Sequence, residues 1–216
     1  MANLGQFDNR KIHFGIQVGY IQSMFDLDFS QDDELRQTLQ GVTSYYTPGF
    51  NVAIMAPDLK LNRWLTLRTI PGVTLITRDV DYTWEPDYLA SHPLAERRRN
   101  VESVYGDIPI ELTLRAVRYG NFRPYLVAGT CYSFDIASLR KNRNRTNQMI
   151  IRLSPHDLRY SMGVGFDVFL RYVKFAIEFK TSFGLVDLKI EDPDVYIRSF
   201  EGLKSRTFML SFIFED

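Results

Sequence analysis

The sequence has a single cysteine, Cys131, among its 216 residues. One thiol forms no internal disulfide and supplies no multi-cysteine metal site. The chain also lacks an excess of charge of either sign, because 26 Lys and Arg residues balance 26 Asp and Glu residues. A balanced chain has no global electrostatic attraction to nucleic acid, so we expect no nucleic-acid partner.

Long apolar runs are missing as well. No stretch approaches the roughly 18 consecutive apolar residues of a membrane-spanning helix. Residues 1–5 have neither the basic start nor the apolar segment of a secretory signal. We find no internal repeat, low-complexity segment or linker, which favours one domain. We expect residues 1–10 to be a flexible N-terminal segment and residues 11–216 to form the domain.

What the chain does contain is strict alternation of apolar and polar residues, most clearly over residues 158–185. In the second half of this stretch Phe175, Phe179 and Phe183 share one face, and charged or small residues occupy the other. Successive side chains on a strand point to opposite faces, so a period of two predicts two strands here. The short link at residues 170–172 makes them antiparallel neighbours.

The same pattern predicts eight strands in all, over residues 11–23, 49–55, 63–84, 101–117, 122–137, 158–168, 173–185 and 204–214. The third is interrupted at Pro71-Gly72, which indicates a bend or bulge. Residues 26–46 read as a polar segment that contains a short capped helix from Ser30 to Gly41. Short turns and long polar loops alternate between the strands, as expected for antiparallel neighbours.

Alternation alone does not say which face of a barrel is inside. The apolar face carries many large rings, such as Phe122, Phe166 and Phe212, whereas glycines such as Gly163 and Gly165 gather on the other face. An eight-stranded barrel has little interior space, so the face with glycine and charge belongs inside. The apolar face then looks outward, opposite to its place in a soluble lipocalin-like barrel.

The sequence therefore predicts an all-β protein, an eight-stranded antiparallel up-and-down transmembrane β-barrel of outer-membrane type. Such an apolar belt is too large for a water-soluble surface. In lipid, a closed barrel pairs every backbone group of the wall. We expect the cell outer membrane as the location, with a signal peptide already removed, and outer-membrane lipids and lipopolysaccharide as partners.

Charged residues fall on the inward face of the predicted strands. One interpretation is a proton path, a selective pore or a catalytic carboxylate pair. The other, which we favour, is a network of ion pairs that fills the lumen, because buried charges persist only when paired and eight strands leave no aqueous channel. The residues concerned are Arg63 or Arg68, Asp107, Glu111, Arg115, Arg123, Asp135, Arg159, Asp167, Lys174, Glu178 and Lys180.

Candidate catalytic or metal-binding groups are sparse. His13, His92 and His156 have no ligand spacing, so we expect neither a metal nor a cofactor. Residues 154–157 contain Ser154, His156 and Asp157, but a catalytic triad is defined by geometry rather than adjacency, and we interpret them as a turn. Cys131 faces inward by parity. The sequence thus predicts no catalytic, cofactor-binding or metal-binding residue.

Two loops and the strand ends carry candidate contact residues. Arg97, Arg98 and Arg99 lie in a charged loop at residues 85–100, and a basic loop at residues 139–147 carries Arg140, Lys141, Arg143 and Arg145. The basic loop is either solvated or binds lipopolysaccharide phosphates. Aromatic residues near strand ends are candidates for the membrane-interface girdle. These are Tyr20, Trp64, Tyr132, Tyr160 and Tyr172.

Several short motifs resemble the PorT proteins of Bacteroidetes. They comprise Asn121-Phe122-Arg123-Pro124-Tyr125, Ala128-Gly129, residues 132–138, His156-Asp157, residues 163–167, residues 179–185, and residues 203–212. The resemblance implies a non-enzymatic outer-membrane protein required for type IX secretion, linked to gliding in some relatives. It implies other type IX components as partners and carries over no site residue. Lipid modification by an outer-membrane enzyme, and apolar-ligand binding by a soluble barrel, are the alternatives.

Overall fold

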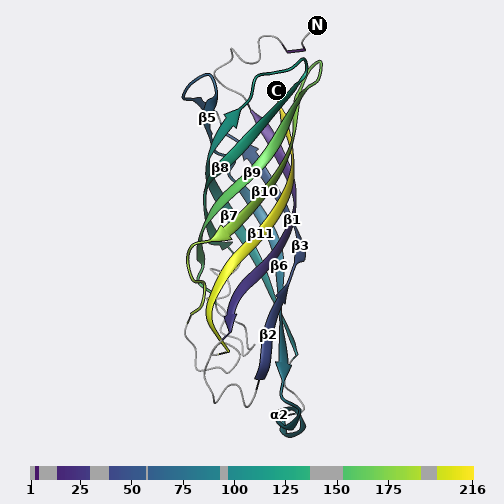
Figure 1. Ribbon diagram of the computed structural model, residues 1–216, viewed down its shortest axis with the longest axis vertical. Coiled ribbons are helices and arrows are strands. Elements are labelled where there is room, and N and C mark those ends of the chain that lie inside the picture. The colour runs from purple at the N-terminus through teal and green to yellow at the C-terminus, as the bar shows by residue number, and fades with distance from the viewer. Residues whose placement is uncertain are drawn as a thin grey trace.

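The computed structural model describes residues 3–4, 14–29, 39–56, 58–92, 97–136, 153–190 and 199–216. Most of them lie in strands that wind around one long axis (Figure 1). The strands are β1 (Gly15–Phe29), β2 (Leu39–Tyr45), β3 (Thr47–Met55), β4 (Leu59–Lys60), β5 (Leu65–Arg68), β6 (Gly72–Trp84), β7 (Arg98–Arg115), β8 (Phe122–Asp135), β9 (His156–Phe169), β10 (Lys174–Gly184) and β11 (Phe200–Glu215). A short helix, α2 (Pro86–Ser91), follows β6.

The strands close into a ring. In the order β1, β3, β6, β7, β8, β9, β10 and β11, each strand pairs with the next in antiparallel register, and β11 pairs back with β1. A closed ring has no unpaired sheet edge, which a lipid environment requires. The predicted eight-stranded up-and-down barrel is confirmed.

Two of the eight wall strands are built from two pieces. β2 and β3 both pair with β6, and the register changes by one residue between Tyr45 and Gly49, as in a β-bulge. β5 and β6 keep a single register along β7. In the break between them, the Thr69 hydroxyl donates to the carbonyl oxygen of Pro109 (2.6 Å), and Pro71 has no N–H to offer. The long third strand, interrupted at Pro71, is confirmed.

The prediction of a polar segment at residues 26–46 is wrong at both of its ends. β1 continues to Phe29, and β2 begins at Leu39 and pairs with β6. The predicted helix is contradicted at residues 39–41, which are strand, and its residues 30–38 lie outside the described residues. The charged loop at residues 85–100 is also shorter than predicted, because α2 occupies part of it and β7 starts at Arg98.

The apolar face changes sides along the barrel. Near its start, β6 points Val73 and Leu75 outward, 44% and 53% exposed. Farther along the same strand, Val80 is fully buried while Asp79 and Asp81 take the outward positions. This end of the lumen holds an apolar cluster of Phe25, Leu39, Val80, Tyr82, Trp84, Val101, Leu188, Phe200 and Leu203. The inversion marks the level at which the surroundings change from lipid to water, because apolar side chains avoid water.

Both chain ends and the short turns lie at one end of the barrel, and α2 lies at the other (Figure 1). At the short-turn end, the Asn3 backbone N–H donates to Asn121 Oδ1 (2.8 Å), and Asn3 Nδ2 donates to the carbonyl oxygen of Phe169 (3.1 Å). Residues 5–13 lie outside the described residues. The domain boundary at residue 10 therefore stays a prediction. By the rule for outer-membrane barrels, the short turns are periplasmic and the α2 end is external.

Candidate functional site

A ring of four charges lies in the middle of the lumen. Arg68 pairs with both Glu111 (2.9 Å) and Glu178, and Lys180 pairs with the same two carboxylates at 2.5 and 3.3 Å. The Tyr125 hydroxyl also donates to Glu178 (2.9 Å). Two cations thus meet two carboxylates, so the ring is neutral, and none of the four side chains is more than 8% exposed.

A second group of charges lies toward the short-turn end. Lys174 contacts Glu215 (2.5 Å) and Asp167 (3.4 Å), and Arg123 also pairs with Asp167 (3.0 Å). These four side chains come from four different strands. They join four consecutive strands, β8 to β11, along one side of the lumen and add a second layer of paired charges.

A third group lies on the α2 side of the central ring. Arg159 pairs with Asp107 (2.8 Å) and lies 3.7 Å from Asp157. Ser133 donates to Asp107 (2.5 Å) and also contacts Arg159, while Asp157 accepts a hydrogen bond from Ser205. The three layers leave a small polar cavity of about 50 Å³ between Glu111, Lys180, Cys131 and Asp107, which has room for about one water molecule.

The lumen network predicted from parity is confirmed. Arg68 is the inward residue of the two arginines considered, because Arg63 is exposed. All the other predicted charges point inward, and Cys131 does too, since it lines the polar cavity. The ion-pair interpretation fits better than a pore, because the charges are paired and the central ring crosses the interior from β5 and β7 to β10.

Among the described residues, sequence reasoning missed five inward charges: Asp58, Arg78, Arg99, Asp157 and Glu215. Asp58 pairs with Arg115 (2.9 Å) at the short-turn end. Arg78 is fully buried, and its Nε donates to Ser23 Oγ (3.0 Å). The signal was present for Arg78, because it shares its parity on β6 with the inward residues Thr74 and Ile76.

Gly165 makes room for the contact between Tyr125 and Glu178 in the central ring. A Cβ added at Gly165 would lie 2.2 Å from the Tyr125 ring, so this ring packs directly on the backbone of β9 at a position without a side chain. The ring position in turn brings the Tyr125 hydroxyl to Glu178. The sequence argument that glycine marks the crowded interior is confirmed at this position.

Residues 154–157 do not form a catalytic triad. The Ser154 hydroxyl donates to the backbone oxygen of His156 (3.2 Å), not to its ring, and His156 Nδ1 lies 2.7 Å from the Tyr132 hydroxyl. Asp157 points into the lumen, whereas His156 is exposed on the other face of β9. His156 also begins a strand instead of lying in a loop.

The other predicted histidines offer no metal site. His92 caps α2 and stacks on Tyr88 (4.3 Å between ring centroids), and His13 lies outside the described residues. No group of three His, Cys, Asp or Glu side chains in the described part of the chain is placed to hold a metal ion. That no cofactor or metal binds stays a prediction.

The arginines predicted to form an exposed cluster are only partly exposed. Arg98 lies on the outside and pairs with Asp81 (2.7 Å), which lowers the pKa of the Asp81 carboxyl, chiefly through the hydrogen bond. Arg99 is 6% exposed and points inward, so its place in the predicted cluster is wrong. It alternates with Arg98 because both belong to β7. Residues 139–147 lie outside the described residues.

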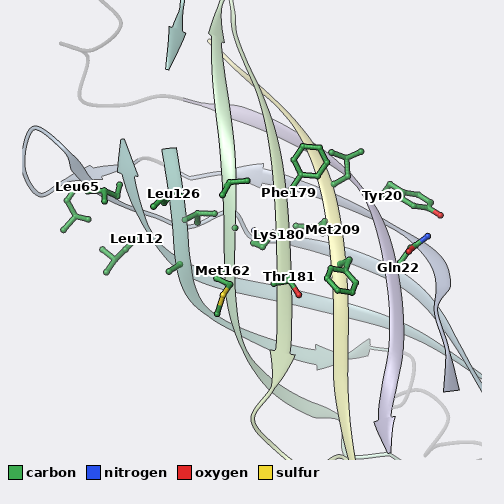
Figure 2. A pocket seen from close by; sticks show the side chains of 17 residues that line it. Tyr20, Gln22, Leu65, Leu112, Leu126, Met162, Phe179, Lys180, Thr181 and Met209 are labelled. Atoms are coloured by element: carbon green, nitrogen blue, oxygen red, sulfur yellow. The ribbon is translucent and has the colours of Figure 1, made fainter. Parts of the chain in front are cut away.

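The outer wall is apolar and carries an open groove of about 940 Å³ (Figure 2). Its lining comes from neighbouring strands, with Leu126 on β8, Met162 on β9, Phe179 on β10 and Phe208 on β11. Each of these side chains is more than 40% exposed. The predicted assignment of Phe175, Phe179 and Phe183 to the lipid face, with Lys174, Glu178 and Lys180 in the lumen, is confirmed. Of the predicted girdle residues, Tyr20 lines the groove itself.

A closed ring of eight strands, a lumen filled by charge and an apolar outer wall define an outer-membrane β-barrel protein. The chain belongs to a family described as outer membrane protein beta-barrel domain, which matches residues 4–189. In the described residues, no helix is long and apolar enough to cross a membrane. No curated protein matches the chain.

The chain is similar to solved structures of two proteins, the outer membrane protein OprG and Ail. OprG from Pseudomonas aeruginosa is 15% identical, with 96% of this chain and 97% of that chain covered and a TM-score of 0.43. Ail, the attachment invasion locus protein of Yersinia pestis, is 13% identical, with 96% and 100% covered and a TM-score of 0.43. A second Ail structure, in complex with the heparin analogue sucrose octasulfate, is 12% identical, with 96% and 100% covered and a TM-score of 0.40.

Proposed function

We propose that this outer-membrane barrel is a PorT-like protein of Bacteroidetes that serves type IX secretion without catalysing a reaction. Its role is that of an accessory or assembly component, and its partners are other type IX components. The observation that carries this proposal is the blocked lumen: cargo does not cross a barrel whose interior is filled by three layers of paired charges. Such a barrel acts through its surfaces.

The motifs that resemble PorT support the proposal in a specific way. Arg123 and Tyr125 belong to one motif, and Gly165 and Asp167 belong to another. In the lumen, Arg123 pairs with Asp167 (3.0 Å), and the Tyr125 ring packs on Gly165. The two motifs therefore contact each other inside the lumen and contribute to the layers of charge that fill it. A structural role of this kind fits a family without catalytic residues.

The experiment is deletion of the gene in its native host, followed by complementation. We expect loss of export of proteins that carry the C-terminal signal domain, with restoration by the intact chain. Variants that lack residues 86–92, which include α2, or residues 139–147 then test the loop surfaces, with barrel levels measured as the control. Normal export from the deletion strain would refute the proposed role.

The alternative of a lipid-modifying enzyme has no observation in its favour, because Ser154 and His156 are not arranged as nucleophile and base. An acyl-ester hydrolysis assay on the purified barrel tests it. Activity that is lost in Ser154→Ala or His156→Ala, with the barrel still folded, would replace the binding role by a catalytic one.

A further inference from the structure

Arg206 lies on the outward face of β11 between two aromatic rings. Its guanidinium carbon is 5.2 Å from the centre of the Phe183 ring and 6.0 Å from that of Phe208. Its Nε is enclosed and has no hydrogen-bond partner. In register, Arg206 faces Met24 on β1 and Phe183 on β10, so neither directly opposite residue offers a carboxylate.

The two rings belong to a longer aromatic band on the outside of the barrel. Phe208 contacts Tyr46 with 5.4 Å between ring centroids, and Phe183 stacks on Tyr160 at 5.2 Å. Aromatic residues gather where lipid headgroups meet the acyl chains. The band lies on the α2 side of the apolar wall, since Asp26 and Asp28 take the outward positions farther along β1. Arg206 is thus held at the level of the external headgroups.

The apolar groove begins beside this arginine. Phe208, which flanks Arg206, also lines the groove, together with Thr181 and Met162 of the next strands (Figure 2). The groove runs from there along the wall over Leu126 and Leu112. A cation at one edge of an apolar groove matches an amphiphile with an anionic head and an acyl chain.

Two outward cations lie close together on β11, Arg206 and Lys204, and Arg206 is the better candidate for binding an anionic headgroup. Lys204 is the next outward residue on β11, and it faces Asp26 directly in the β1 register. The residue opposite Lys204 on β1 is therefore a carboxylate, whereas Arg206 has aromatic rings on both sides. Arginine also presents a planar fork of donors that matches a phosphate, and it stacks on aromatic faces.

We propose that Arg206 binds a phosphate of lipopolysaccharide in the external leaflet, with an acyl chain of the same molecule in the groove. The rings of Phe183 and Phe208 flank the guanidinium on the outward face of the barrel. The proposed lipopolysaccharide site depends on the membrane orientation of the barrel and not on the role in type IX secretion. An experiment that refutes one of these two proposals therefore leaves the other standing.

The test uses the folded barrel in detergent, titrated with lipid A and followed by native mass spectrometry. Arg206→Gln should weaken lipid A binding about tenfold or more, which corresponds to about 1.4 kcal/mol. Arg206→Lys should recover part of the loss, since it restores the charge but not the planar fork. Dephosphorylated lipid A should bind the intact protein as weakly as lipid A binds Arg206→Gln.

The matched control is Arg171→Gln. Arg171 also lies near an aromatic ring, that of Tyr172 at 5.5 Å, but in the turn at the periplasmic end. Its substitution should leave lipid A binding unchanged. Thr181→Trp fills the groove from an outward position and should weaken lipid A binding while leaving Arg206 in place. Retention of the folded band in an unheated gel verifies each variant.

Three results would overturn the proposal. Unchanged lipid A affinity in Arg206→Gln would remove the phosphate contact. Equal affinity for phosphatidylethanolamine would show a general phospholipid contact in place of lipopolysaccharide. Unchanged affinity in Thr181→Trp would show that the groove takes no part.

Discussion

Replacing Glu178 by Gln should destabilise the barrel more than any conservative change on its outer wall. Glu178 is fully buried and accepts contacts from Arg68, Lys180 (3.3 Å) and Tyr125 (2.9 Å). The substitution keeps the shape of the side chain but leaves the central ring with two cations and one carboxylate. Removal of one partner of a buried ion pair typically costs about 3–5 kcal/mol. We expect a loss of unfolding free energy in that range.

A second substitution tests whether charge is the cause. Glu178→Gln combined with Lys180→Met returns the ring to one cation and one carboxylate, Arg68 and Glu111, which remain 2.9 Å apart. The double variant should therefore lose less stability than the sum of the two single variants, since residues in one network couple by about 0.5–3 kcal/mol.

The assay is equilibrium urea unfolding in lipid vesicles, followed by tryptophan fluorescence and by the gel mobility of the folded form. Phe179→Leu is the control, because Phe179 neighbours Glu178 on β10 but points to lipid, 50% exposed. An exposed change of this kind usually alters stability by about 0.5 kcal/mol or less. A cost below about 1 kcal/mol for Glu178→Gln would refute the paired-charge account of the lumen.

Three further expectations concern the wall, the lumen and its packing. A spin label at position 179 should be quenched by lipid-borne quenchers, and a label at 180 should not; the reverse would invert the assignment of the faces. The intact protein should give no stable unitary currents in planar bilayers, because the paired side chains of the central ring cross the lumen, and such currents would contradict a filled lumen. Gly165→Leu should cost stability through its clash with the Tyr125 ring, and Tyr125→Ala in the same chain should relieve part of that cost in a denaturant titration.

The barrel wall could be predicted from sequence because one physical rule governs it. Along β8, β9 and β10, lipid outside and a crowded lumen inside impose opposite demands on alternate residues. The parity of Phe179 and Lys180 is enough to place both side chains. Glycine then settles which face is inside, as Gly165 and Tyr125 illustrate.

The α2 end could not be read in the same way, because its alternation has the opposite sense. In β1, Tyr20 points outward, but Phe25 is an apolar residue that points inward. When the apolar residues of a strand switch from outward to inward positions, the alternation of apolar and polar residues in the sequence is interrupted, although the strand itself continues. This is why residues 26–29 and 39–45 were predicted as polar segment and helix when they continue the wall.

The partners of the central ring also needed the structure. Parity places Glu111 and Glu178 in the lumen but does not say that Arg68 and Lys180 reach both of them. Which carboxylates each cation reaches depends on the stagger of the strands and on the length of the side chains. Arg206 was missed for a similar reason, since its aromatic neighbours come from two different strands.

The change of apolar face along the strands has a consequence for insertion depth. Asp79 and Asp81 on β6 and Asp26 on β1 stand on the outside just beyond the apolar wall. If the barrel sank toward the periplasm by two residues, these carboxylates would enter the edge of the hydrocarbon, where a charge on the lipid face of a barrel costs up to about 1 kcal/mol. If it rose, the outward rings of Tyr46 and Phe208 near the external rim would meet water. The change of apolar face along the strands therefore fixes how deeply the barrel is inserted, and with it the height of its external end above the membrane.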